Sequence, residues 1–143
     1  MSYNNLHGSI PQWMTNLTRL FLLDLSNNNF NGTIPYDLGR LQGFSVNIAN
    51  GFNWGQYDFN MEEYIKGIEY NVSSVLTTNI ILDLSKNNLT GEIPVSIGNM
   101  RSLRLLNFSG NQLEGNIPAS FSEISTLEQL DLSKNNLGGE IPE

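Results

Sequence analysis

The stretch LDLSKNNLTGEIP, residues 82–94, decides the fold because most of the chain repeats it. The pattern Leu-x-Leu-Ser-x-Asn-x-Leu-x-Gly-x-Ile-Pro returns every 24 residues, with its serine at positions 85, 109 and 133. Two further copies stand upstream, the first of them partial, with Ser2 and Ser26 in the same position. A fixed period of this length predicts a solenoid, in which each repeat forms one coil and neighbouring coils bury a shared apolar core.

A period of this length with the spacing Leu-x-x-Leu-x-Leu-x-x-Asn is the signature of a leucine-rich repeat, although Asn79 stands where a leucine is expected. It predicts an α/β solenoid, a right-handed arc with a parallel β-sheet on its concave side and short 3-10 or α turns on its convex side. Side chains alternate along a strand, so the leucines should enter the core and the residues between them should face out. Four strands are expected, at residues 21–25 and around the pairs Leu82/Leu84, Leu106/Phe108 and Leu130/Leu132.

Recurrent polar residues in the turns are expected to be structural. An asparagine follows every strand, and a buried amide can satisfy backbone groups of the adjacent coil; these residues are Asn28, Asn87, Asn111 and Asn135. The glycines at 8, 32, 91, 115 and 139 should take backbone angles closed to other residues. The apolar faces at the two ends, around Leu6 and Leu137, should be open.

One long insertion interrupts the period. Pro35 and Pro94 are 59 residues apart, 35 more than one period. We therefore divide the chain into repeats at 1–41, the first of them partial, an insertion at 42–76, and three repeats at 77–143, the last of them truncated. Tyr64, Lys66 and Ile68 could alternate on a strand, and Gly67 would cost a helix interior about 1 kcal/mol but suits a turn. We therefore favour a hairpin with Lys66 and Gly67 near its bend, projecting between the first two strands. A helix over the same residues is the alternative.

Composition narrows the possible functions. The net charge is −7, with only 7 Lys plus Arg, so no basic stripe could meet nucleic acid or an anionic membrane surface. The sequence contains no run of 18 apolar residues that could form a membrane helix, so we expect no direct membrane insertion by this segment. The start lacks the basic flank and apolar core of a signal peptide, and it falls inside a repeat. We interpret the chain as an internal piece of a longer solenoid.

The sequence contains no convincing set of catalytic residues. The chain has no cysteine, and its one histidine, His7, lacks the partners of a metal site or a catalytic triad. The neighbouring Glu62 and Glu63 suggest a solvated acidic loop more than a glycosidase pair. We therefore expect no enzyme activity and no cofactor.

The strand residues between the leucines form the candidate binding surface on the concave side. Solvated positions are the favoured reading of this row, and contacts with a ligand are the alternative. Asn107 lies between Asp83 and Asp131 and keeps two carboxylates out of direct register. The predicted row consists of Asp24, Asp83, Asn107, Gln129 and Asp131.

Asn-x-Ser/Thr sequons suggest glycosylation in a secretory history. Four of them are candidate sites, at Asn16, Asn31, Asn71 and Asn88. A fifth, at Asn107, lies on the concave strand face, where a glycan would block binding.

Two features together resemble a known family. The repeats with S-x-N-x-L-x-G-x-I-P resemble the plant class of extracellular leucine-rich repeats, which occurs in receptor kinases, receptor-like proteins and polygalacturonase inhibitors. Tyr57, followed after eight residues by Lys66 and Gly67, is similar to the Tyr-x8-Lys-Gly motif that ends the island domain of plant receptor-like proteins. The chain departs from that family in having three repeats after the insertion, where four are usual.

The resemblance implies a non-catalytic recognition module on the extracellular side of the plasma membrane, in immune or developmental signalling. It implies a protein or peptide ligand and a co-receptor of the somatic-embryogenesis receptor kinase type. Tyr57 would anchor this partner, Lys66 would contact it or pair with a nearby glutamate, and Gly67 would set the bend. A purely structural role for all three residues stays open. The alternatives are the ectodomain of a receptor kinase and a secreted inhibitor of cell-wall hydrolases.

Overall fold

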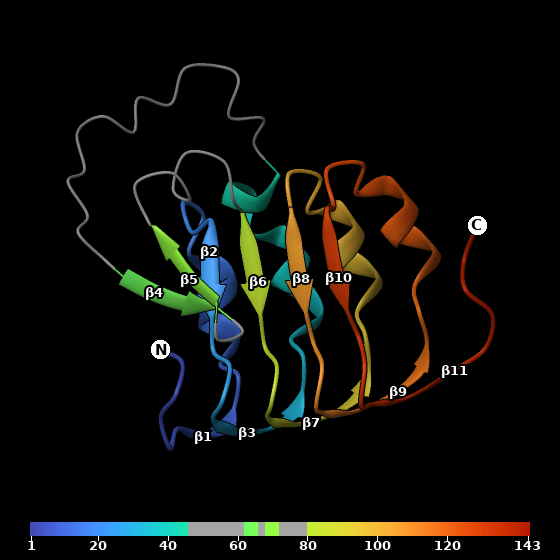
Figure 1. The fold of residues 1–143 in the computed structure, drawn as a ribbon. Helices are drawn as coiled ribbons and strands as arrows, with labels where there is room; N and C mark the ends of the chain where they lie inside the picture. Colours follow the sequence, from blue (N-terminus) through green and yellow to red (C-terminus); the bar gives the residue numbers. More distant parts are fainter. Residues whose placement is uncertain (46–61, 66–67, 72–79) are drawn as a thin grey trace, which may run out of the picture. The chain divides into compact units, whose positions relative to one another are not determined.

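The computed structural model describes residues 1–45, 62–65, 68–71 and 80–143 (Figure 1). The chain divides into two compact units, the repeats (Met1–Val46 with Ile80–Glu143) and the insertion (Asn47–Asn79). This division starts later than the expected insertion at 42–76, because a short 3-10 helix, η3 (Gln42–Phe44), continues the repeats. Phe44 is fully buried.

One parallel strand from each coil forms the first sheet. The sheet confirms the four predicted strands, each somewhat shorter than expected, because pairing is limited to three residues per coil. Their core leucines, such as Leu82 and Leu106, are fully buried. In the spatial order β2-β6-β8-β10, the strands are Leu22–Asp24, Ile81–Asp83, Leu105–Asn107 and Gln129–Asp131 (Figure 1).

A second parallel sheet runs along the turns and was not predicted. The signal for it was present, because Leu89, Gly91 and Ile93 alternate with polar residues after the first-sheet strand. The three long middle strands share a pattern in which the second residue is buried between exposed neighbours. In order, the strands are β1 (His7–Ser9), β3 (Asn29–Thr33), β7 (Asn88–Glu92), β9 (Gln112–Asn116) and β11 (Asn136–Gly138).

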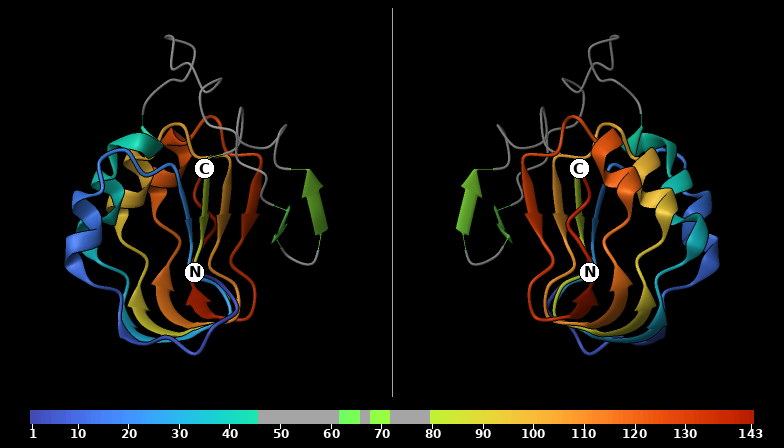
Figure 2. Two further views of the ribbon diagram at one scale, coloured as in Figure 1. Left: turned by 90° about the vertical axis from the view of Figure 1, so that its left-hand side faces the viewer. Right: turned by 90° about the vertical axis from the view of Figure 1, so that its right-hand side faces the viewer.

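Short 3-10 helices close the third side of the coils, as predicted for the convex side. Each begins directly after the proline of an Ile-Pro pair, which holds an extended residue before it and allows a helical turn to start. Figure 2 shows these helices on the side of the repeats opposite the first sheet. They are η1 (Gln12–Asn16), η2 (Tyr36–Arg40), η6 (Val95–Asn99) and η7 (Ala119–Glu123).

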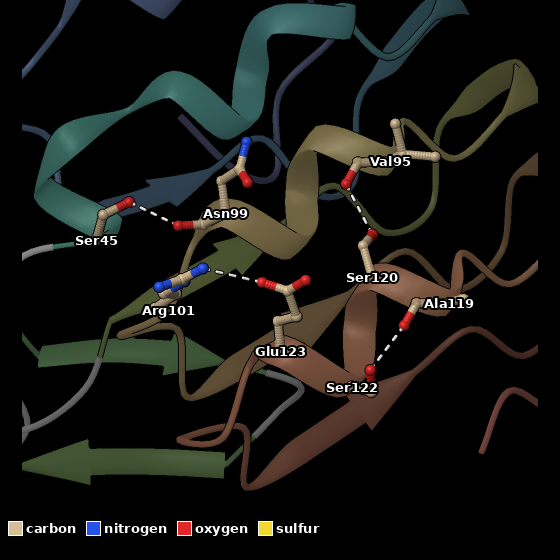
Figure 3. A network of polar contacts seen from close by, with 8 residues as sticks. All are labelled: Ser45, Val95, Asn99, Arg101, Ala119, Ser120, Ser122 and Glu123. Carbon is tan, nitrogen blue, oxygen red and sulfur yellow. Dashed lines mark hydrogen bonds and ion pairs between the residues drawn. The ribbon is translucent and has the colours of Figure 1, made fainter.

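Polar contacts tie neighbouring helices together (Figure 3). The hydroxyl of Ser120 donates to the carbonyl of Val95 at 2.7 Å, and the hydroxyl of Ser45 donates to the carbonyl of Asn99 at 2.8 Å. The carbonyl of Asn99, at the end of η6, is one that the helix itself leaves open. The helical side is therefore fixed from coil to coil by backbone acceptors.

The predicted asparagine ladder is confirmed. The side-chain oxygen of Asn87 accepts from the backbone N–H of Phe30 in the preceding coil at 3.0 Å. Its amide donates to the carbonyl of Leu25 in that coil at 3.0 Å and to Leu84 in its own coil at 3.1 Å. Asn28, Asn111 and Asn135 repeat this arrangement. The five turn glycines take φ between 73° and 91°, as expected.

The two ends of the repeat unit are open, as predicted. Leu6 at one end is 40% exposed and Leu130 at the other is 48% exposed, whereas Leu106 and Leu113 inside the stack are fully buried. Leu130 was expected in the core. Its exposure has a simple cause: within this chain no further coil covers β10.

The insertion contains a hairpin. β4 (Glu62–Ile65) and β5 (Ile68–Asn71) pair antiparallel, with Ile65 opposite Ile68. The hairpin prediction is confirmed and the helix alternative is wrong. The register pairs Tyr64 with Glu69, so Tyr64 and Ile68 do not share a face as a continuous alternation would require. Tyr57, Lys66 and Gly67, on which the partner-binding prediction rests, lie outside the described residues.

Candidate ligand-binding face

Each strand of the first sheet has two outward positions, one on either side of its core leucine. The earlier position is apolar in three strands and is Gln129 in β10. The later position always carries a carboxylate or an amide. We call these eight residues the outward face; they are Leu22 and Asp24, Ile81 and Asp83, Leu105 and Asn107, and Gln129 and Asp131.

The acidic and amide residues of the outward face hold the turns after their strands. In every coil the side-chain oxygen accepts from the backbone N–H two residues further along, an arrangement that favours Asp and Asn at this point. The distances are 2.9 Å for Asp24 and Ser26, 2.9 Å for Asp83 and Ser85, 3.2 Å for Asn107 and Ser109, and 3.1 Å for Asp131 and Ser133.

Burial separates this row into two parts. Asp24, Asp83 and Asn107 are at most 6% exposed, so the expectation that the row is solvated is wrong for these three residues. The turn hydrogen bonds explain why polar groups are tolerated there, since a buried acceptor needs a donor. Gln129 is exposed and Asp131 half-buried, so the accessible polar part of the outward face lies on β10.

The insertion places two carboxylates in direct register. Asp24 of β2 is the register partner of Asp83 of β6. On its other side, Asp83 accepts a 3.0 Å hydrogen bond from the side-chain amide of Asn107. The sequence indicated the separation of Asp83 from Asp131 by Asn107, but the Asp24–Asp83 contact was missed because the insertion separates the two residues along the chain.

Burial raises the pKa of the Asp83 carboxyl above its ordinary value of 3.8, because the charged form loses its hydration. The neighbouring charge of Asp24 raises it further. Hydrogen bonds from Ser85 and Asn107 favour the charged form and oppose this rise without cancelling it. The β2–β6 contact therefore carries an electrostatic cost that the β6–β8 contact relieves.

The sequon asparagines differ in accessibility. Asn16, Asn31 and Asn88 are exposed, whereas Asn107 is 1% exposed and bonded to Asp83. Asn31 and Asn88 are register partners in the second sheet, a proximity that the sequence did not reveal. Asn71 ends β5.

Neither metal nor membrane features appear in the part of the chain that is described. His7 is exposed in β1, and no three His, Cys, Asp or Glu side chains among the described residues are placed to hold a metal ion. No described helix has the length and apolar character needed to cross a membrane. The outward face offers hydrogen-bond acceptors, donors at Gln129, and apolar side chains, which together suit recognition of another chain.

Family models for the leucine-rich repeat match residues 19–41 and 80–137. Receptor-like protein 52 of Arabidopsis thaliana is 37% identical over 112 residues, which cover 71% of this chain and 13% of that protein. Receptor-like protein 34 of the same plant is 37% identical over 115 residues, covering 73% of this chain and 12% of that protein. The chain thus spans about an eighth of the length of these relatives.

Solved structures show the same coil. The crystal structure of a TDR receptor superposes with a TM-score of 0.72 at 34% identity, over 99% of this chain and 18% of that one. The Arabidopsis receptor kinase HAESA, in complex with the peptide hormone IDA and the co-receptor SERK1, gives a TM-score of 0.57 at 28% identity. That match covers 99% of this chain and 22% of the matched chain of the complex.

Proposed function

The chain belongs to the leucine-rich repeat receptor-like proteins of plants, and from this premise we propose that it is a non-catalytic recognition module of a cell-surface receptor. The observation that carries the proposal is the outward face, which continues in register from β2 to β10 although the insertion interrupts the chain. A rigid sheet that presents one row of side chains suits binding, because its positions are preset. The module would act on the extracellular side of the plasma membrane, in immune or developmental signalling.

The ligand in this proposal is a protein or peptide. Support comes from HAESA, whose repeats share this fold and whose structure contains a peptide hormone. In this chain, Gln129 and Asp131 are the polar outward residues that a ligand could reach. A peptide with donor groups would suit them, and the net charge of −7 would favour a basic segment.

The second partner in this proposal is a co-receptor of the somatic-embryogenesis receptor kinase type. The HAESA complex supports it, because a co-receptor named SERK1 is part of that assembly. The contact would involve Tyr57, Lys66 and Gly67 of the insertion together with the repeats that follow. The competing reading is that these three residues only shape the insertion.

Substitutions in a full-length receptor that carries this segment test the co-receptor contact. Lys66→Glu should abolish co-precipitation with the co-receptor, because it reverses the charge of the side chain that would contact that partner. Ligand binding and export to the cell surface should stay intact. Lys66→Arg, which keeps the charge, is the matched control. Retention of the Lys66→Glu receptor in the endoplasmic reticulum would assign a structural role. Normal association of both Tyr57→Ala and Lys66→Glu would show that the proposed contact is wrong.

A receptor-kinase ectodomain is the second candidate, since the HAESA neighbour is a receptor kinase. The full-length transcript distinguishes the two, because a kinase domain downstream would be unmistakable. A secreted inhibitor of cell-wall hydrolases has less support, because such inhibitors resemble these repeats but lack an insertion of this kind.

Glycans at Asn16, Asn31, Asn71 and Asn88 belong to the same proposal. Exposure of Asn16, Asn31 and Asn88 supports it. At Asn107, burial and the hydrogen bond to Asp83 oppose modification. Peptide mass spectrometry of the secreted receptor, with and without removal of N-glycans, should show occupancy at the first four and an unmodified Asn107.

A further inference from the structure

Two sequons lie side by side in the second sheet, although 57 residues separate Asn31 from Asn88 along the chain. The first sequon is residues 31–33 of β3, and the second is residues 88–90 of β7. The strand register pairs Asn31 with Asn88 and Thr33 with Thr90. Each of the two strands has a further neighbour on its other side, β1 or β9 (Figure 1). The junction that the insertion interrupts therefore brings two acceptor asparagines together inside the sheet.

The acceptor and threonine side chains of both sequons occupy one exposed face. Asn31, Thr33, Asn88 and Thr90 are all exposed, and residues two apart on a strand point to the same face. Neighbouring strands lie about 4.8 Å apart, and an N-linked glycan is bulky. Glycans on both asparagines would therefore compete for the same space over the sheet. A single glycan has more room, because the register partner of Asn31 on its other side is Ser9, which has a small side chain.

Pairing of the two strands closes the second sequon to modification. The hydroxyl of Thr90 donates to the carbonyl of Gly32, the middle residue of the first sequon, at 3.4 Å. The N–H of Leu89, which is fully buried, donates to the side-chain oxygen of Asn111 at 3.1 Å. A sequon is recognised through its asparagine and its hydroxyl residue, so both must be accessible to the enzyme. Asn88 therefore has to be modified before β7 pairs with β3.

Synthesis gives Asn31 a head start over Asn88. A chain grows at about 5–20 residues per second, so Asn31 is made roughly 3 to 11 s before Asn88. β3 cannot pair with β7 until β7 has been made, so the first sequon stays open to modification throughout this interval. In a molecule that is modified at Asn31, the glycan is already in place when β7 arrives. The order of synthesis thus favours Asn31 and leaves Asn88 to the molecules in which Asn31 was missed.

We propose that Asn31 and Asn88 act as one alternative glycosylation site, so that a secreted molecule carries a glycan on one of them and never on both. In each transfer, the side-chain nitrogen bonds to the anomeric carbon of a lipid diphosphate-linked oligosaccharide and loses a proton. The lipid diphosphate leaves with the electrons of the broken carbon–oxygen bond. Across the population both sites are then occupied, each in part of the molecules, with the larger share at Asn31. This inference rests on the proposed passage of the receptor through the secretory pathway.

Peptide mass spectrometry of the secreted full-length receptor that carries this segment measures the fraction of molecules modified at each site. The fractions for Asn31 and Asn88 should add up to no more than one. Thr33→Ala removes the first sequon and keeps Asn31, so the fraction at Asn88 should rise towards the sum of the two original fractions. Thr90→Ala should raise the fraction at Asn31 in the same way. Thr33→Ser keeps the sequon, so this matched control should change the fraction at Asn88 much less.

Asn16, which is exposed on η1, is the internal reference, and its modified fraction should be the same in every variant. If Thr33→Ala lowers secretion, Asn31→Gln removes the same sequon and should give the same rise at Asn88. Fractions that add up to well above one would overturn the proposal, as would fractions that do not respond to loss of the other site. Glycan at Asn16 with none at Asn31 and Asn88 would overturn it and leave the proposed receptor function standing. A receptor without glycan at any sequon would contradict passage through the secretory pathway, and this inference would fail with it.

Discussion

Two junctions between coils can be compared within this molecule. At one, β2 meets β6 across the insertion; at the other, β6 meets β8 through one uninterrupted repeat. The backbone bond from Leu25 to Asp83 at the first junction and that from Leu84 to Asn107 at the second are both 2.9 Å. Stacking is thus specified by the residues of each coil, and the chain that links them has little influence on its geometry.

The junctions differ in their outward residues. Two aspartates face each other at the β2–β6 junction, whereas an aspartate meets an asparagine at the β6–β8 junction. Only the second arrangement supplies a hydrogen bond between the two side chains. The comparison teaches that the core and the ladder are the same at both junctions and that the outward face is where they diverge.

The largest effect is expected from removing one ladder asparagine at each junction. Asn87→Ala leaves the N–H of Phe30 buried without a partner and removes one of the two donors to the Leu25 carbonyl, which keeps that of Asn28. Asn111→Ala does the same to Leu89 and Leu84 one coil later. Each should lower the free energy of unfolding by about 3 kcal/mol, measured by urea denaturation. Asn88→Ala, at an exposed neighbour, should cost little. A much larger loss for Asn87 would show that the insertion does weaken its junction.

A methyl group between the helices should have the next largest effect. A Cβ added at Gly39 would lie 1.7 Å from the carbonyl oxygen of Ser96, and one at Gly98 would lie 2.5 Å from that of Ser120. Both distances require the backbone to shift, so Gly39→Ala and Gly98→Ala should each destabilise by about 2 kcal/mol, with the larger loss at Gly39. Thermal unfolding measures this. Gly138→Ala, where a Cβ meets nothing within 4 Å, is the control, and a loss there of similar size would contradict the steric explanation.

Making the outward face of the two junctions alike should stabilise the protein. Asp24→Asn removes the like charge beside Asp83 and places an amide where it can donate, as Asn107 does on the other side. The pKa of Asp83 is raised in the fold, so ionising it costs stability above that pKa and costs nothing below the ordinary value of 3.8. The substitution should therefore add about 1 kcal/mol at pH 7 and almost nothing at pH 3.

Chemical denaturation at both pH values measures this gain. Asp131→Asn, at the edge of the sheet where the residue is half-buried, is the control and should change stability less. A gain from Asp24→Asn that persisted at pH 3 would mean that the effect comes from packing and that charge plays no part.

The smallest effect is expected from the ion pair on the helical side of the coils that carry η6 and η7. Arg101 and Glu123 approach to 3.0 Å, but their side chains are 67% and 56% exposed. Solvent screens such a pair, so Arg101→Ala should cost only about 0.3 kcal/mol, and less at high salt. A double-mutant cycle with Glu123→Ala isolates the interaction. A coupling above about 1 kcal/mol would show that ion pairs contribute to stacking as strongly as a hydrogen bond of the ladder.

The period alone predicted much of this architecture. It assigned each coil its first-sheet strand, its short helix, its turn glycine and its ladder asparagine. This worked because residues 24 apart are the same and also have the same surroundings in neighbouring coils. In the insertion, the glycine at position 67 favoured a hairpin over a helix. The second sheet was missed, because its residues were interpreted as a turn.

The outward face was predicted less well. Spacing identifies equivalent residues, but it does not show which coils become neighbours when an insertion separates them, so the pairing of Asp24 with Asp83 was not foreseen. Burial of these carboxylates depends on three-dimensional packing, which spacing does not describe. The prediction for Tyr57 rested on a sequence motif alone, and a motif does not show which residues Tyr57 contacts.

Register across the insertion has an evolutionary consequence. A coil boundary that tolerates the whole of Asn47–Asn79 without altering the strand pairing of β2 with β6 can accept new sequence there while the rest of the domain folds unchanged. Duplication, loss or exchange of sequence at such a boundary then leaves the pairing of the flanking coils in place. New sequence can therefore be inserted between coils, because the residues that stack the coils lie within each coil.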